Sequence, residues 1–155
     1  MSRSLAALQP ELQQKYRLFE AAMVEANIHF ILTCTDRTII EQMALFSMGR
    51  MDLADVNTFR AIAGLPAIIR QENVKVTWTL NSKHVTNMFD ADLNNDRSRA
   101  FDIALLKAGK PHWDIKVSVN DNEIPDYEEA GKIGESVGLI WGGRWKKPDY
   151  PHFEI

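Results

Sequence analysis

The spacing of the apolar residues changes along this chain, and that change constrains its fold more than any other feature. In four segments the apolar side chains recur every three or four residues, which places them on one face of a helix. In three others they recur at every second residue, as in a half-buried strand, and the chain end is expected to add a fourth strand. The expected helices are residues 11–26, 38–49, 52–64 and 125–138, and the expected strands are residues 74–80, 101–105, 115–119 and 152–155. This order predicts an α+β fold with a small, mainly antiparallel sheet flanked by helices.

Two local patterns refine this expectation. Thr38 and Glu41 have the spacing of a capping box, in which side chain and backbone bond reciprocally at the start of a helix. In residues 101–105 the large apolar side chains alternate with Asp102, so this carboxylate should point away from the core.

Length and composition exclude several classes of protein. The 155 residues fit one domain, and we expect a single domain over residues 1–155. The net charge of −3 argues against nucleic acid as the main partner. The sole cysteine, Cys34, excludes an internal disulfide and a cysteine-based zinc finger, so a metal site would need His, Asp or Glu. No stretch approaches the roughly 20 apolar residues of a membrane span, and no signal-peptide core is present at the start. We therefore expect a chain made in the cytosol without membrane insertion.

Two of the four histidines have neighbours that suit chemistry. His84 follows the first predicted strand, and His152 lies three residues after Asp149 with prolines at 148 and 151 that predict a turn. Two imidazoles and a carboxylate can form a three-ligand catalytic zinc site that leaves a position for water. From spacing alone, residues scattered over the surface are the favoured explanation.

Four short motifs together resemble one enzyme family. They are Ser82-Lys83-His84, Ser98-Arg99-Ala100-Phe101-Asp102, Trp141-Gly142-Gly143-Arg144-Trp145 and Pro148-Asp149-Tyr150-Pro151-His152-Phe153-Glu154. They are similar to VanY-like, D-Ala-D-Ala-carboxypeptidase-type zinc peptidases, and within that group to phage L-alanyl-D-glutamate peptidases (endolysins). An upstream block, Thr35-Asp36-Arg37-Thr38 with Glu41-Gln42 and Gly49-Arg50, resembles the same family.

The resemblance implies a role for each matching residue. His84, Asp102 and His152 would be the zinc ligands, and Asp149 the carboxylate that takes a proton from water and passes it to the leaving amine. Arg37 would stabilise the oxyanion or hold a substrate carboxylate. Ser82 would contact the substrate. The implied fold is that shared by D-Ala-D-Ala peptidases and Hedgehog signalling domains.

The chain departs from the family between the first histidine and the aspartate. The family has a compact H-x-x-G-x-A-x-D motif, whereas here the separation from position 84 to position 102 is 18 residues. A rival alignment makes Asp90 or Asp92 the ligand. Within this insert, Asp90, Asp92, Asn94 and Asp96 occupy alternate positions as in a calcium loop. That pattern lacks the usual glycine and final glutamate, so a solvated acidic loop is expected, with a Ca²⁺ site as the alternative.

The function implied by the resemblance is hydrolysis of the L-Ala–D-Glu bond of peptidoglycan stem peptides by a zinc-dependent phage endolysin. Such a protein is expected to be monomeric, to lack a separate cell-wall-binding domain, and to wait in the host cytoplasm until a holin releases it. Two alternatives stay open. One is a D,D-carboxypeptidase or D-Ala-D-Ala dipeptidase of the same fold, and the other is a non-catalytic zinc-binding module.

Overall fold

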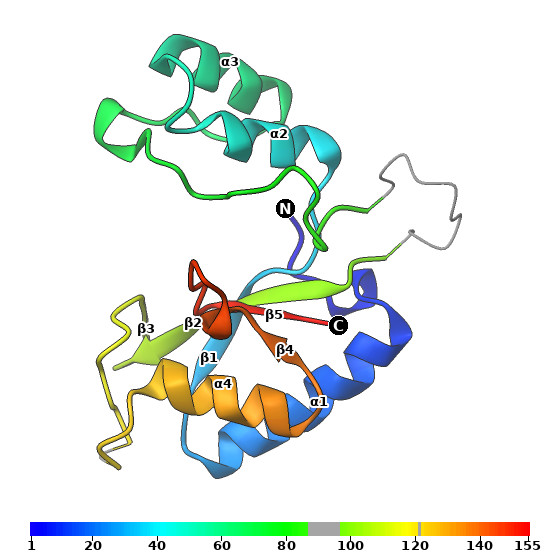
Figure 1. The fold of residues 1–155 in the computed structure, drawn as a ribbon, viewed down its shortest axis with the longest axis vertical. Coiled ribbons are helices and arrows are strands. Elements are labelled where there is room, and N and C mark those ends of the chain that lie inside the picture. Colours follow the sequence, from blue (N-terminus) through cyan, green and yellow to red (C-terminus); the bar gives the residue numbers. More distant parts are fainter. Residues whose placement is uncertain (87–96, 121) are drawn as a thin grey trace.

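A five-stranded antiparallel sheet forms the centre of the protein (Figure 1). The computed structural model describes residues 1–86, 97–120 and 122–155. The strands run in the order β1-β2-β5-β4, and β3 also pairs with β2. Their bounds are β1 Phe30–Cys34, β2 Ala100–Lys107, β3 Lys110–His112, β4 Ile140–Trp141 and β5 His152–Glu154. The predicted α+β class with a mainly antiparallel sheet is therefore confirmed.

Four α-helices form where the apolar spacing predicts them. They are α1 Pro10–Glu25, α2 Ile39–Ser47, α3 Leu53–Ile62 and α4 Asp126–Ser136, with single 3₁₀ turns at Leu5–Ala7, Arg70–Glu72 and Gly142–Arg144. The predicted capping box is confirmed, because the Glu41 amide donates to the Thr38 hydroxyl and the Thr38 amide donates to the Glu41 carboxylate. No helix in the described ranges is both long and apolar enough to cross a bilayer.

The main core lies between one face of the sheet and helices α1 and α4, while α2 and α3 lie beyond the other face (Figure 1). Phe101, Ile103 and Leu105 of β2 are fully buried in this core beside Phe19 of α1. The intervening Asp102 points to the opposite face, as its place in the alternation predicts. The sheet thus separates the core from a polar site on the side of α2.

The strand predicted over residues 74–80 is wrong. The segment follows the 3₁₀ turn Arg70–Glu72 and pairs with no strand in the described part of the chain. Its alternating side chains are exposed rather than packed on a core; Val74, Val76 and Trp78 show exposed fractions of 56%, 51% and 56%. Residues 76–79 instead line a cavity, with the apolar and the polar side chains both contributing.

The strand predicted over residues 115–119 is also wrong. The carboxylate of Asp114 accepts a hydrogen bond from the Lys116 amide at 2.9 Å, a local turn that competes with strand pairing. The pairing strand is β3, which meets the end of β2 through a tight turn at Gly109. Strands β1 and β4 escape prediction because the first lacks alternation and the second spans two residues.

Candidate metal centre

Three neighbouring strands place Cys34, Asp102 and His152 in one row across the sheet. In the antiparallel register, Cys34 of β1 and His152 of β5 each lie directly opposite Asp102 of β2. Opposed residues of adjacent strands project from the same face, with their side chains in contact. A register irregularity after Leu32 brings Cys34, rather than Thr33, opposite Asp102.

The fourth member of the cluster, His84, comes from a turn that two other segments hold in place. Its carbonyl accepts a hydrogen bond from the Arg37 amide at 2.9 Å. The neighbouring Lys83 carbonyl accepts one from the Arg99 amide at 2.9 Å, just before β2. These bonds fix the backbone on both sides, and the side chain is 1% exposed. His84 is therefore buried over the row of residues on the sheet.

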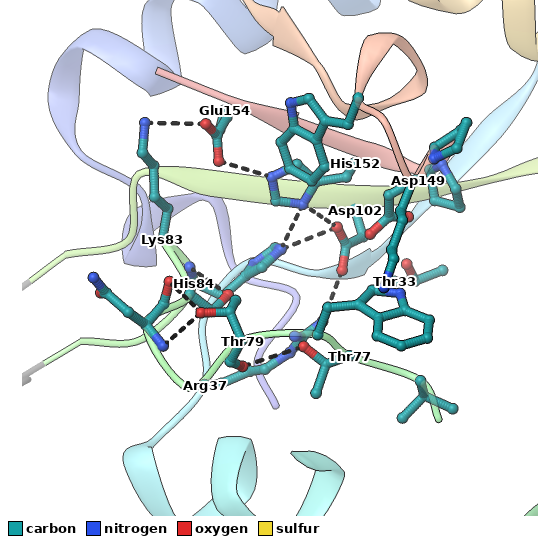
Figure 2. A pocket seen from close by; sticks show the side chains of 18 of the residues that line it. Thr33, Arg37, Thr77, Thr79, Lys83, His84, Asp102, Asp149, His152 and Glu154 are labelled. Carbon is teal, nitrogen blue, oxygen red and sulfur yellow. Dashed lines mark hydrogen bonds and ion pairs between the residues drawn. The ribbon is translucent and has the colours of Figure 1, made fainter. Parts of the chain in front are cut away.

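The predicted ligands His84, Asp102 and His152 converge on one point (Figure 2). His84 Nε2 lies 3.0 Å from Asp102 Oδ1 and 3.3 Å from His152 Nδ1, which itself lies 3.0 Å from the same oxygen. Zinc bonds of about 2.0–2.2 Å place two donors of a tetrahedral site roughly 3.3–3.5 Å apart. The observed spacings are close to these values, so the donor set fits a zinc ion.

The charges around these donors also favour a cation. Burial alone would raise the pKa of Asp102, but the adjacent rings of His84 and His152 outweigh burial and hold it well below the usual value. Burial alone would lower the pKa of His152, but hydrogen bonding to Asp102 and Glu154 raises it to about 9. The electrostatic field at this point therefore stabilises a positive charge, whether a proton or a metal ion carries it.

The ring of His152 has a second neighbour, on the side that faces away from His84 and Asp102. Glu154 Oε2 lies 3.1 Å from His152 Nε2, and Lys83 Nζ bonds the other oxygen of Glu154 at 3.0 Å (Figure 2). Sequence reasoning missed Glu154, although residues two apart on a strand share a face. Such outer partners fix the orientation of a metal-binding imidazole.

Cys34 is a second residue that sequence reasoning missed. Its Sγ lies 3.7 Å from His84 Nδ1, the nitrogen on the opposite side of the ring from Asp102. Cys34, His84 and Asp102 are near enough to hold a metal ion together, with ligand atoms within 4.8 Å. However, burial raises the pKa of the Cys34 thiol to about 11, which keeps it neutral. Because its sulfur faces the His84 nitrogen that points away from Asp102 and His152, Cys34 fits better as a neighbour of His84 than as a fourth ligand.

Arg37 lies inside the site and bonds a candidate ligand. Its Nη2 donates to Asp102 Oδ2 at 2.8 Å (Figure 2). Its Nη1 donates to Gln42 Oε1 at 3.2 Å. The same guanidinium lines the cavity. Its buried Nε has no hydrogen-bond partner in the described part of the chain. Arg37 therefore places a positive charge beside Asp102 and the cavity.

Asp149 and Ser82 line a cavity of about 1000 Å³ over the three candidate ligands. The turn that the two prolines predict is confirmed, because the His152 amide donates to the Asp149 carbonyl at 3.2 Å. Partial burial of its carboxyl group and the charge of Asp102 raise the pKa of Asp149. Ser82 accepts a hydrogen bond from the His84 amide at 3.4 Å.

The predicted calcium loop and the rival ligands Asp90 and Asp92 lie outside the described residues.

Comparisons with known proteins show which chains this one is similar to. Residues 96–155 match the profile of a family described as D-alanyl-D-alanine carboxypeptidase. The chain is 27% identical over 150 residues to the peptidoglycan L-alanyl-D-glutamate endopeptidase CwlK of Bacillus subtilis strain 168, covering 96% of this chain and 73% of that protein. The fold is similar to the L-Ala D-Glu endopeptidase ChiX of Serratia marcescens, with a TM-score of 0.57, 19% identity and coverage of 99% and 86% of the two chains. The resemblance inferred from the motifs is confirmed.

Proposed function

We propose that this chain, which resembles peptidases of the VanY-like, D-alanyl-D-alanine carboxypeptidase type, is a zinc-dependent peptidoglycan peptidase that cuts the L-Ala–D-Glu bond of stem peptides. The observation that carries the proposal is the convergence of His84, Asp102 and His152 within 3.3 Å beneath a cavity that Asp149 also lines. The choice of bond rests on the similarity to a protein named for cutting L-alanyl-D-glutamate.

The proposed zinc ligands are His84, Asp102 and His152, through the atoms that face one another. Zinc held in this way supplies a Lewis acid and makes a water molecule nucleophilic near neutral pH. Asp149 accepts the proton of the attacking water and returns it to the leaving amine. A raised pKa suits this role, because a base nearer to neutral pH holds and releases a proton more readily.

Arg37 has a positioning and electrostatic role in this proposal. By bonding Oδ2 of Asp102, its guanidinium leaves Oδ1 facing the two histidines. Because it also lines the cavity, its charge favours the oxyanion that develops when the peptide carbonyl is attacked. Ser82 is proposed to shape the turn before His84 and to contact the peptide.

A specific observation favours one alternative, and another observation argues against a second. The matching family profile is described as D-alanyl-D-alanine carboxypeptidase, which favours release of D-Ala as a second candidate activity. A non-catalytic zinc module would have no need for Asp149 in the cavity wall. The role as a monomeric phage endolysin released by a holin is part of our proposal and rests on the sequence motifs.

Digestion of purified peptidoglycan followed by mass spectrometry of the new termini tests the proposed bond. We expect fragments with a free D-Glu amino terminus, whereas released D-Ala would support the alternative.

Asp149→Asn should lower the rate of peptide hydrolysis by at least about 100-fold while zinc stays near one ion per chain. Asp52→Asn is a matched control, because Asp52 is exposed and its side chain makes no cap hydrogen bond. Unchanged hydrolysis by Asp149→Asn would contradict the role of Asp149.

A further inference from the structure

Two segments far apart in sequence form facing walls of the cavity and touch each other. Residues 145–149, between the 3₁₀ turn Gly142–Arg144 and β5, supply one wall, and residues 76–79 supply another. The walls meet where Lys147 Nζ lies 3.8 Å from the ring centroid of Trp78. Trp78 is 56% exposed, so its ring is available at the surface of the cavity. The contact holds the Lys147 ammonium at a defined place, because a cation is attracted to an aromatic face.

This part of the cavity is positively charged although the chain has a net charge of −3. Besides Lys147, the ring of Trp78 has Lys75 Nζ at 5.8 Å and Arg50 Cζ at 5.9 Å. Neither Lys75 nor Arg50 lines the cavity, whereas Lys146 and Lys147 both do. The cationic residues therefore surround one aromatic ring at the cavity wall.

Two of the three carboxylates that line the cavity are already paired with other groups. Glu154 pairs with Lys83 at 3.0 Å, and Asp102 pairs with Arg37 at 2.8 Å. Within the described ranges, Lys147 forms no ion pair. Lys146 and Lys147 outnumber the one remaining carboxylate, Asp149, so an anionic group of a ligand would balance the charge of this wall. Asp149, two residues along the same wall, places this position beside the proposed reaction centre.

We propose that Lys147, held over Trp78, binds a carboxylate on the substrate residue that follows the scissile bond. This inference rests on the proposed function and concerns the specificity of the same site. In a stem peptide, the D-glutamyl residue continues through its side-chain carboxyl group, so its α-carboxylate stays free. That carboxylate lies next to the bond to be cut and matches the charge of the Lys147 wall.

Two synthetic stem peptides that differ in one group test the proposal. One carries the free α-carboxylate on D-Glu, and the other carries the α-amide at that position. We expect the zinc-loaded protein to cleave the acid with a kcat/KM about tenfold higher than the amide. Lys147→Met should lower kcat/KM for the acid to that for the amide and leave cleavage of the amide within about twofold.

Lys75→Met is the matched control, because it removes the same charge beside the same ring but outside the cavity lining. It should reduce the preference for the acid by less than about twofold. Equal cleavage of acid and amide by the unaltered protein would overturn the proposal, as would an equal effect of Lys75→Met and Lys147→Met. A preference that Lys147→Met leaves intact would also overturn it.

A binding measurement separates this inference from the proposed function. If neither peptide is cleaved, the proposed function is wrong, and calorimetric titration of both peptides into the zinc-loaded protein still judges the subsite. Tighter binding of the acid that is lost in Lys147→Met supports it, and equal binding contradicts it. A third peptide that ends in D-Ala-D-Ala tests whether Lys147 instead binds the carboxylate at the end of the peptide. A Lys147-dependent release of D-Ala would overturn the D-glutamyl assignment.

Discussion

The candidate ligands share one property that isolated polar residues rarely have. Asp102 presents one oxygen to the two histidines and gives the other to Arg37 at 2.8 Å. His152 likewise presents one nitrogen to the cluster while the other lies 3.1 Å from Glu154. A side chain whose second polar atom is already bonded cannot rotate away without losing that bond. The neighbours therefore preorganise the donors for an ion, which reduces the cost of binding it.

The first prediction concerns Glu154 and the affinity for zinc. Glu154→Gln keeps the shape of the side chain but removes the charge next to His152 Nε2. The other nitrogen of the imidazole then becomes a weaker ligand for zinc. We expect zinc affinity to fall about 10–100-fold, measured by competition with a chromophoric chelator. Glu135→Gln is the control, because Glu135 pairs with the exposed Arg144 on the surface. Equal zinc affinity of the Glu154 variant and the unaltered protein would show that Glu154 does not act through His152.

At the scale of elements, the sequence predicted those strands whose alternation faces a core. Strand β2 is of this kind, and its pattern correctly places Asp102 on the polar face. The alternation in residues 74–80 is equally regular, yet the segment lines a cavity and pairs with no strand in the described ranges. A single sequence shows alternation but not what covers each face. The positions of Cys34 and Glu154 depend in addition on strand register, which local patterns do not specify.

The second prediction concerns the 3₁₀ turn Gly142–Arg144, which supports the Asp149 segment. The Asp149 amide donates to the Gly142 carbonyl at 3.0 Å, and a Cβ added at Gly142 would lie 2.6 Å from the Asp149 carbonyl oxygen. Because that neighbour is backbone, Gly142→Ala must displace the Asp149 turn. We expect a loss of about 1–3 kcal/mol in the free energy of unfolding, measured in urea, and a fall in peptidase activity beyond that.

A suitable control for this variant is Gly64→Ala, at a position with no atom within 4 Å of the added Cβ. Gly64 has a φ of +67°, so alanine there costs only backbone strain of about 1 kcal/mol, at the end of α3. Activity per folded molecule should therefore be unchanged in Gly64→Ala. If both variants lose activity in proportion to stability alone, the turn at Gly142 has no special role in placing Asp149.

At the scale of the whole molecule, the site joins three regions of the chain that no local pattern relates. His84 comes from the turn between the α2–α3 region and the sheet, Asp102 from β2, and His152 from β5 near the end of the chain. The sequence indicated these residues through their family motifs, since periodicity alone could not bring positions 84 and 152 together. The turn that carries His84 is held by the backbone amides of Arg37 and Arg99, which donate to the carbonyls of His84 and Lys83.

The third prediction follows from this three-way connection. A zinc ion bound by donors from three segments stabilises only the folded state, by about 4 kcal/mol when free zinc is 1,000 times its Kd. For a domain of this size, that corresponds to a rise of about 10 °C in the melting temperature. Phenanthroline should therefore lower the melting temperature by about this amount and abolish peptidase activity, and added zinc should restore both.

Two controls accompany this measurement. His152→Ala should melt at the same temperature with and without zinc, because the two remaining donors bind zinc too weakly. Mg²⁺ should not replace zinc, since it prefers oxygen ligands in octahedral geometry. If zinc does not change the melting temperature of the unaltered protein, the three donors do not share an ion.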